Sequence, residues 1–122
     1  MSASPAPRRS SPEPFLWLLF SAGGMAAALV LPAVMLLFGV LIPLGLIDAP
    51  EPAHLLAVVR NPLTKLVLIG VSVLTLFHAA HRFRFTFEHG LQLGRFDPVI
   101  ALCCYGAAIL GSVVGFWVLI SV

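Results

Sequence analysis

Three long apolar stretches, separated by short polar segments, form the dominant pattern of this chain. No charged residue interrupts Phe15 to Ile47, Leu66 to His81, or Pro98 to Val122. A helix of roughly 20 apolar residues is enough to cross a hydrocarbon core of about 30 Å. The pattern therefore predicts an all-α integral membrane protein with three transmembrane helices.

Prolines, glycines and charges indicate where these elements begin and end. Four prolines rule out a regular helix in the Ser- and Pro-rich N-terminal tail: Pro5, Pro7, Pro12 and Pro14. A straight helix over the whole first apolar stretch would reach roughly 50 Å, which exceeds the membrane core. We therefore place the first span near residues 22–43, after a shallow helical segment at the membrane surface. The expected segments are a tail over 1–14, a first helical segment over 15–47, a connection over 48–65, a second transmembrane helix over 66–87, a turn over 88–97 and a third transmembrane helix over 98–122.

Two local features of the polar segments are also predicted. The connection should contain a short interfacial helix from His54 to Arg60. In the turn before the third span, Asp97 precedes Pro98. An aspartate at the N-cap followed by a proline at the first helical position is a typical helix start. We expect Asp97 to cap the third helix in this way.

The composition supports lipid as the solvent of this chain. Of its 122 residues 60% are hydrophobic and 10% are charged, and the mean hydropathy is +1.05. A soluble domain carries roughly 25% charged residues. A chain of this length is too short to bury three apolar helices inside a soluble core. The net charge of +2 is too small to indicate a nucleic-acid partner.

The distribution of cations predicts an orientation. One side of the membrane would hold the N-terminal tail and the loop between the second and third spans, with Arg8, Arg9, Arg82, Arg84 and Arg95. The other side would hold only Arg60 and Lys65. Short loops rich in Lys and Arg stay in the cytoplasm. We therefore expect a cytoplasmic N-terminus, a periplasmic connection over 48–65 and a periplasmic C-terminus.

The third span offers packing features rather than reactive groups. Cys103 and Cys104 are adjacent inside an apolar run and are interpreted as small buried hydrophobes. Gly111 and Gly115 form a Gly-x-x-x-Gly pattern that suits close packing against a neighbouring helix. The sequence contains no iron–sulfur or zinc motif, so a cofactor of that kind would belong to a partner. We assign no catalytic residue and no metal ligand to this chain.

The end of the second span carries the candidate chemistry. Helical spacing places His78, His81, Arg82, Phe85 and His89 on one face. Ionisable groups near the membrane are costly and usually face a bundle interior or a ligand. Two interpretations remain open: a functional polar pocket, or an anchor in which arginines reach lipid phosphates. Anchoring accounts for the arginines but not for the short imidazoles.

A membrane-boundary pair of His and Arg suits a quinone. A quinone carbonyl needs a hydrogen-bond donor and the reduced form must lose protons, and an imidazole can serve both needs. A tryptophan on a neighbouring helix could add a ring N–H and an apolar wall. The same histidines could instead bind a haem iron. The pair Arg84 and Glu88, one helical turn apart, is expected to form a weak interfacial ion pair.

Several segments resemble the family formed by the D subunit of fumarate reductase. The residues from Pro14 to Met25, PFLWLLFSAGGM, resemble the opening of that family. The segment from Gly39 to Leu46 is also similar and is followed by a polar connection of similar length. The dipeptide His81-Arg82 lies at the matching place near the end of the second helix. The resemblance extends from about Arg8 to Val122.

This resemblance implies the following function. The chain would be a hydrophobic anchor in the bacterial inner membrane, in a heterotetramer with a second anchor (the C subunit), an iron–sulfur subunit and a flavoprotein subunit. Menaquinol would be oxidised at a site shared among these subunits, and fumarate would be reduced at the distant flavin. FAD and the iron–sulfur clusters would lie only in the partner subunits, and no haem is expected. By position, the resemblance implies quinone-binding roles for Trp17, Phe20, His81 and Arg82.

The chain departs from the family pattern at two places. Ser21 stands beside the expected pocket where the family often has glycine. After His81-Arg82 the family is commonly rich in histidine, whereas this chain has Arg84, Phe85 and Glu88 before His89. The polarity of the pocket and its proton route could therefore differ. The alternatives are a haem b-binding anchor of succinate dehydrogenase and a non-redox structural membrane subunit.

Overall fold

A computed structural model describes residues 11–122, and every regular element in that part of the chain is helical. Three continuous helical stretches are long and apolar enough to cross a membrane: Glu13–Leu41, Pro62–Gly90 and Gly94–Ser121. This finding confirms the predicted all-α fold with three candidate spans. The elements are α1 (Glu13–Leu36), η1 (Leu37–Leu41), α2 (Pro52–Arg60), α3 (Pro62–Phe85), η2 (Thr86–Gly90), η3 (Gly94–Phe96) and α4 (Asp97–Ser121).

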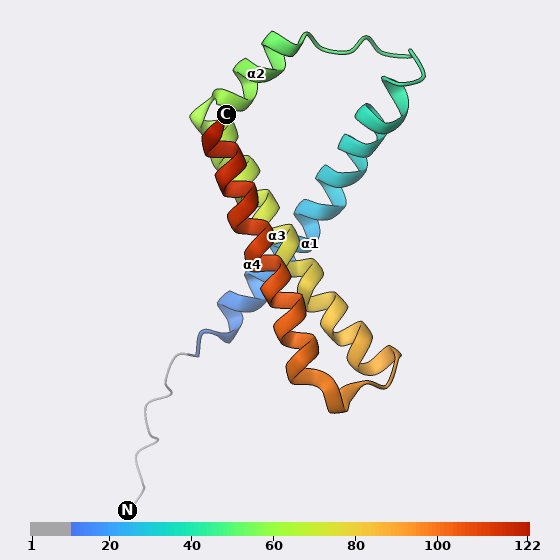
Figure 1. The fold of residues 1–122 in the computed structure, drawn as a ribbon, viewed down its shortest axis with the longest axis vertical. Helices are drawn as coiled ribbons and strands as arrows, with labels where there is room; N and C mark the ends of the chain where they lie inside the picture. The colour runs from blue at the N-terminus through green and yellow to red at the C-terminus, as the bar shows by residue number, and fades with distance from the viewer. Residues whose placement is uncertain (1–10) are drawn as a thin grey trace, which may run out of the picture.

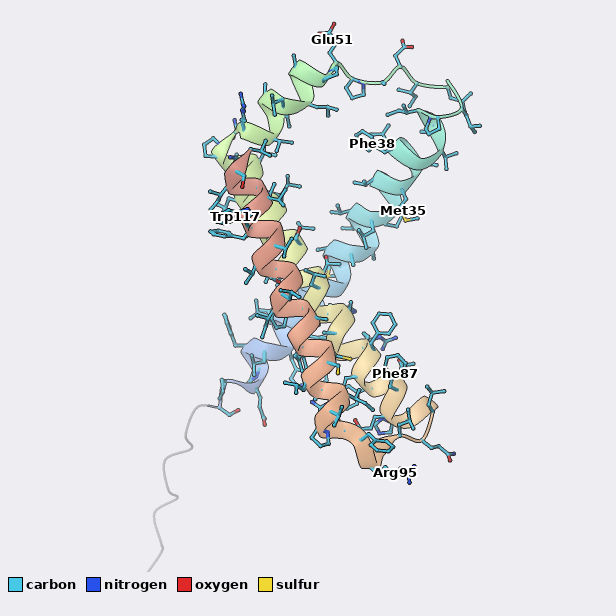
Figure 2. All side chains as sticks on the ribbon, viewed as in Figure 1. Met35, Phe38, Glu51, Phe87, Arg95 and Trp117 are labelled. Atoms are coloured by element: carbon cyan, nitrogen blue, oxygen red, sulfur yellow. The ribbon has the colours of Figure 1, made fainter. Side chains whose placement is uncertain are left out.

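The three long helices are arranged around α3. Helices α3 and α4 run antiparallel side by side, and α1 packs across α3 near its middle (Figure 1). Beyond the crossing, the end of α1 and the π-helical η1 diverge from α3 and are joined to it by an extended loop and α2 (Figure 1). Glu51 in this connection and Arg95 in the turn before α4 lie at opposite ends of the molecule (Figure 2). The polar segments thus lie at the two ends of the helices.

The first span begins earlier than its apolar stretch. Helix α1 starts at Glu13, inside the segment predicted as a tail. Pro14 is tolerated in its first turn, because backbone N–H groups there have no partner within the helix and the missing N–H of proline costs no hydrogen bond. Pro32 lies inside α1, and the chain becomes π-helical at Leu37. Gly45 has a φ of +70°, a conformation that favours glycine, just after the helix ends. The predicted tail residues 1–10 lie outside the described residues.

The second span also begins earlier than its charges suggest. The side chain of Asn61 caps α3, because its Oδ1 accepts hydrogen bonds from the backbone N–H groups of Leu63 at 2.9 Å and Thr64 at 3.4 Å. The helix therefore starts at Pro62 rather than Leu66. The short helix predicted in the connection is present as α2.

Two predictions about the turn before α4 are wrong. Phe96, not Asp97, is the N-cap residue of α4, and no side chain caps this end. Asp97 lies in the first turn, and its carboxylate accepts two hydrogen bonds from Arg84, at 2.8 Å from Nε and 2.7 Å from Nη2. The predicted pair of Arg84 and Glu88 is replaced by this ion pair. A forked, bidentate contact is stronger than a single local one.

Small residues allow the helices to approach closely. A Cβ atom at Gly23 would lie 2.5 Å from the backbone oxygen of Leu74, so only glycine fits where α1 crosses α3. Ala80 and Ala108, 6% and 3% exposed, mark the contact of α3 with α4. Gly111 also faces α3, whereas Gly115 has open space around it. Only one glycine of the Gly-x-x-x-Gly pattern therefore packs against a helix of the described chain.

Most of the apolar surface faces outward. Leu102 and Trp117 are each 74% exposed, and Met35 is 70% exposed. Met35 and Phe38 lie on the diverging end of the first span, and Trp117 lies on α4 (Figure 2). Such a surface is stable only in contact with lipid or apolar protein, because the exposure of apolar side chains to water is unfavourable.

The two adjacent cysteines of α4 follow the same outward trend. Cys103 is exposed and Cys104 is half-buried, and both are free thiols. The prediction that both are buried is therefore wrong for Cys103, because neighbouring residues on a helix point about 100° apart and only one of them can face α3.

The close approach at Gly23 yields a stability prediction. Gly23→Ala should push α1 away from α3 and cost about 1–3 kcal/mol, because the new methyl group would overlap backbone atoms that cannot move aside. The aggregation temperature of the detergent-solubilised protein should fall. Gly39→Ala is the matched control, since Gly39 has nothing within 4 Å of an added Cβ. Equal stability of the two variants would contradict the packing assigned to Gly23.

Candidate functional site

A cleft of about 530 Å³ lies where α1 crosses α3, within the size range of small-molecule sites. Its walls are mainly apolar and aromatic, and its polar groups come from two histidines, a tyrosine and a tryptophan. The lining residues are Leu16, Trp17, Leu19 and Phe20 of α1, Val73, Leu74, Phe77, His78 and His81 of α3, and Tyr105 of α4.

Phe20 is the centre of the aromatic wall. Its ring stacks on His78 with the ring centroids 4.3 Å apart and meets His81 edge-on at 4.7 Å. Trp17, one turn earlier on α1, meets Phe20 edge-on at 6.0 Å. The spacing of three residues puts both α1 side chains on one face of the helix. The wall therefore depends on α1 crossing α3 at this level.

His78 forms a hydrogen bond that determines which of its ring nitrogens carries the hydrogen. Its Nδ1 lies 2.9 Å from the backbone oxygen of Phe20. A carbonyl oxygen can only accept, so Nδ1 must carry the hydrogen. In a neutral imidazole the other nitrogen, Nε2, is then without a hydrogen and can accept a bond. His78 thus presents an acceptor.

His81 forms its contact with the third span. Its Nδ1 lies 2.8 Å from the hydroxyl oxygen of Tyr105. The guanidinium of Arg84 lies near the same tyrosine, with its central carbon 5.9 Å from the ring centroid. A nearby cation makes a phenol a better donor, so we assign the O–H of Tyr105 as the donor to Nδ1. His81 then carries its hydrogen on Nε2 and presents a donor.

An ion pair supports this end of the site. Arg84 and Asp97 join the end of α3 to the start of α4 across the turn, and their side chains are 26% and 29% exposed. Arg84 also lies 5.5 Å from the ring centroid of Phe85, whose ring is 4.7 Å from that of His81. The pair therefore holds the arginine beside Tyr105 and the face of α3 that carries His81.

The structure brings together three of the four residues that the resemblance implied. Trp17, Phe20 and His81 line the cleft. Arg82 does not line it, because one residue along a helix turns the side chain about 100° away, and it is exposed. The relation of these four residues to a quinone stays a prediction.

Sequence reasoning did not assign the other two polar residues of the cleft. The sequence pattern places His78 on the polar face and makes it a possible haem ligand but not a quinone-binding residue, and it assigns nothing to Tyr105. Tyr105 is the single tyrosine of the sequence and stands in an otherwise apolar span. A lone phenol in such a span usually has a hydrogen-bond partner, and this signal could have pointed to it.

Comparison with known proteins identifies the family. The family model that describes the D subunit of fumarate reductase matches residues 7–120. The chain is 67% identical over 114 residues to the fumarate reductase D subunit of Mycobacterium tuberculosis (strain ATCC 25618 / H37Rv), covering 93% of this chain and 91% of that protein. The same values hold for the protein of that name from Mycobacterium bovis (strain ATCC BAA-935 / AF2122/97).

The chain belongs to the family of fumarate reductase D subunits. A more distant relative of the same name, from Actinobacillus pleuropneumoniae serotype 5b (strain L20), is 35% identical over 116 residues, which cover 94% of this chain and 95% of the relative. The resemblance inferred from the sequence is therefore confirmed. With its three apolar helices, this member of the family is a multi-pass membrane protein and a membrane-anchor subunit of fumarate reductase.

The contact between Tyr105 and His81 yields a spectroscopic prediction. In the native protein, histidine ¹⁵N resonances should show His81 with its hydrogen on Nε2. Tyr105→Phe keeps the ring but removes the donor, so the His81 resonances should shift toward a mixture of tautomers. The His78 resonances are the internal control, because the tautomer of His78 is determined by its hydrogen bond to Phe20 and not by Tyr105. Unchanged His81 resonances would contradict the assigned hydrogen bond.

Proposed function

We propose that this anchor helps to form the menaquinol-oxidising site of a fumarate reductase, with the cleft between α1 and α3 receiving the quinol ring. The observation that carries the proposal is an apolar, aromatic cleft with imidazole nitrogens in its lining. A flat aromatic ring is the kind of ligand that stacked side chains accommodate. A quinone needs, in addition, hydrogen-bonding groups at its oxygen atoms, which these nitrogens supply.

Four of the lining residues have distinct proposed tasks. The Nε2 hydrogen of His81 donates to an oxygen of the quinone, and Tyr105 keeps the imidazole in that tautomer. Phe20 and Trp17 form the wall, and the indole N–H of Trp17 is a second available donor. The apolar remainder of the cleft excludes water, which strengthens each hydrogen bond to the ligand.

The proposed complex supplies the other half of the reaction. Its members are a second anchor (the C subunit), an iron–sulfur subunit and a flavoprotein subunit, which form a heterotetramer with this chain in the bacterial inner membrane. The iron–sulfur clusters and the FAD would be held by these partners and would carry the electrons of the quinol to fumarate. Support comes from the family name and from the exposed apolar surface, which fits a second anchor.

Arg82 has a different task in this proposal. Its side chain is exposed outside the cleft at the end of α3 that faces the turn. A guanidinium in that position can bind lipid phosphates or a partner subunit at the membrane boundary. We therefore propose Trp17, Phe20 and His81 as the quinone-binding residues within this chain, and Arg82 as a boundary cation.

The quinone-binding role of His81 can be tested by substitution. His81→Ala should lower quinol-driven fumarate reduction about 5- to 150-fold, because a lost hydrogen bond to a partly desolvated oxygen costs about 1–3 kcal/mol. Reduction driven by a soluble viologen dye should be unchanged, since it bypasses this anchor. His89→Ala is the matched control, because within residues 11–122 the hydrogen bond of His89 is to the backbone oxygen of Phe85, one turn earlier in the same helical stretch.

Three outcomes of this experiment would contradict the proposal. Equal quinol-driven rates for His81→Ala and His89→Ala, in an assembled complex, would make His81 a packing residue. A haem absorption band that disappears in His81→Ala would favour a haem-binding anchor. A chain that purifies without any flavin-containing partner would favour a structural role outside fumarate reductase.

The orientation of the spans is a further proposal, based on the cations at the two ends. Arg84 lies in the last turn of α3 and Arg95 lies in η3, after that helix. Arg60 is the last residue of α2 and Lys65 lies near the start of α3, at the opposite end of that helix. A reporter inserted near Gly94 should be active in the cytoplasm, and one fused after Val122 should be active in the periplasm. Each Arg or Lys forced to the membrane centre would cost about 2.5–3.5 kcal/mol. The reverse pattern for both reporters would overturn the orientation.

A further inference from the structure

His78 is the polar residue of the cleft that the proposed function leaves without a role. It lies one turn before His81 on α3 and is half-buried against α1. Its ring stacks on Phe20, and a Cβ atom at Gly24 would lie 2.7 Å from its Cε1. The lack of a side chain at Gly24 therefore makes room for this imidazole between the two helices.

The contact with α1 uses only one of the two ring nitrogens. Nδ1 donates to the backbone oxygen of Phe20, which leaves Nε2 without a hydrogen. Among residues 11–122, the buried side-chain nitrogen or oxygen atoms without a partner are Thr75 Oγ1 and Glu88 Oε2. Nε2 of His78 has no hydrogen-bond partner among the described residues and is not one of these fully buried atoms. The residue also lines the cleft.

The two histidines present opposite hydrogen-bonding groups. His81, whose Nδ1 accepts from Tyr105, offers an Nε2 hydrogen, whereas His78 offers a bare Nε2. Both rings contact Phe20, so they stand on the same wall. A quinone oxygen can only accept a hydrogen bond, but a quinol hydroxyl both accepts and donates. The bare nitrogen is thus complementary to the reduced ligand alone.

We propose that His78 is a second quinol-binding residue, whose Nε2 accepts the hydroxyl hydrogen of the quinol and takes its proton. This inference rests on the proposed quinol-oxidising function and adds a catalytic residue to it. In the step, the O–H bond of the hydroxyl breaks and an N–H bond forms at Nε2. The electron pair of the O–H bond stays on the oxygen, so the imidazole gains the positive charge and no electron leaves the ligand.

The surroundings of His78 are compatible with this step. His81 on α3 is neutral in the assigned tautomer, and Tyr105 of α4 is engaged with it. The residues of α1 that face the ring, Phe20, Gly23 and Gly24, carry no charge. The positive charge of Arg84 lies nearly two turns further along α3 and is paired with Asp97. No cation of the described chain therefore directly abuts the imidazole that receives the proton.

A purely structural role and the proposed role require different nitrogens of the His78 ring. A link between α1 and α3 needs only the Nδ1 donor to the Phe20 oxygen, while the proposed role needs Nε2. Asparagine places its amide nitrogen near the position of Nδ1, and glutamine places its terminal amide near the position of Nε2. The two substitutions therefore separate the two roles on the same site.

The experiment measures quinol-driven and viologen-driven fumarate reduction by the assembled complex in membranes, with a soluble naphthoquinol as the probe. His78→Asn keeps the link but loses Nε2, so KM for the naphthoquinol should rise about 10-fold and kcat should fall about 100-fold. In His78→Gln the amide oxygen still accepts a hydrogen bond but takes no proton. KM should then stay within about 3-fold, and kcat should fall about 100-fold. Viologen-driven rates should be unchanged in both variants.

The outcomes separate this inference from the proposed function. Wild-type quinol kinetics in His78→Asn, or a poorly assembled His78→Gln beside an active His78→Asn, would overturn the inference and leave His78 as a helix link. If the native complex reduces fumarate with viologen but not with naphthoquinol, the proposed function fails and this inference with it. A fall in kcat for both variants, with KM raised only for His78→Asn, supports the proton-accepting role.

Discussion

The contact between α1 and α3 at Gly23 and Gly24 is the interaction on which the rest of the site depends. A methyl group at Gly23 would overlap the backbone of Leu74, so the two helices meet almost backbone to backbone. This approach brings the Phe20 oxygen within 2.9 Å of His78 and the Phe20 ring against His78 and His81. In lipid, such close packing replaces the hydrophobic effect as the force between helices. The cleft is a consequence of this crossing.

A second principle governs the polar groups around the cleft. In a region with little water, an unpartnered polar group is costly, so each Nδ1 finds a protein partner: the Phe20 oxygen for His78 and the Tyr105 hydroxyl for His81. These partners differ in kind, since a carbonyl accepts whereas a phenol can donate. As a result, two identical side chains present opposite groups to one cleft. Such a difference in environment is how proteins give like residues unlike chemical tasks.

The exposed apolar surface places this chemistry in the context of an assembly. The described chain alone buries few side chains, and its largest apolar residues face outward. The cleft is also only partly enclosed by the described residues. Both features agree with a membrane anchor, which completes its packing only beside other proteins and lipid. The cleft lies toward the end of α3 that carries Arg84, whose ion pair with Asp97 joins α3 to the start of α4.

The sequence by itself determined the three spans, because a continuous apolar stretch has no stable alternative to a helix in lipid. It also determined the family, and through the family resemblance it predicted that Trp17, Phe20, His81 and Arg82 belong to one site. It could not predict that Arg84 would pair with Asp97 rather than Glu88, nor that Tyr105 would bond to His81. Those contacts join residues on different helices, and only the crossing angles and the turn before α4 bring them together. Helical spacing likewise grouped Arg82 with His81, but the tertiary structure decided which side of α3 faces α1 and so left Arg82 outside the cleft. Local pattern specifies the helices, whereas the contacts between them specify the site.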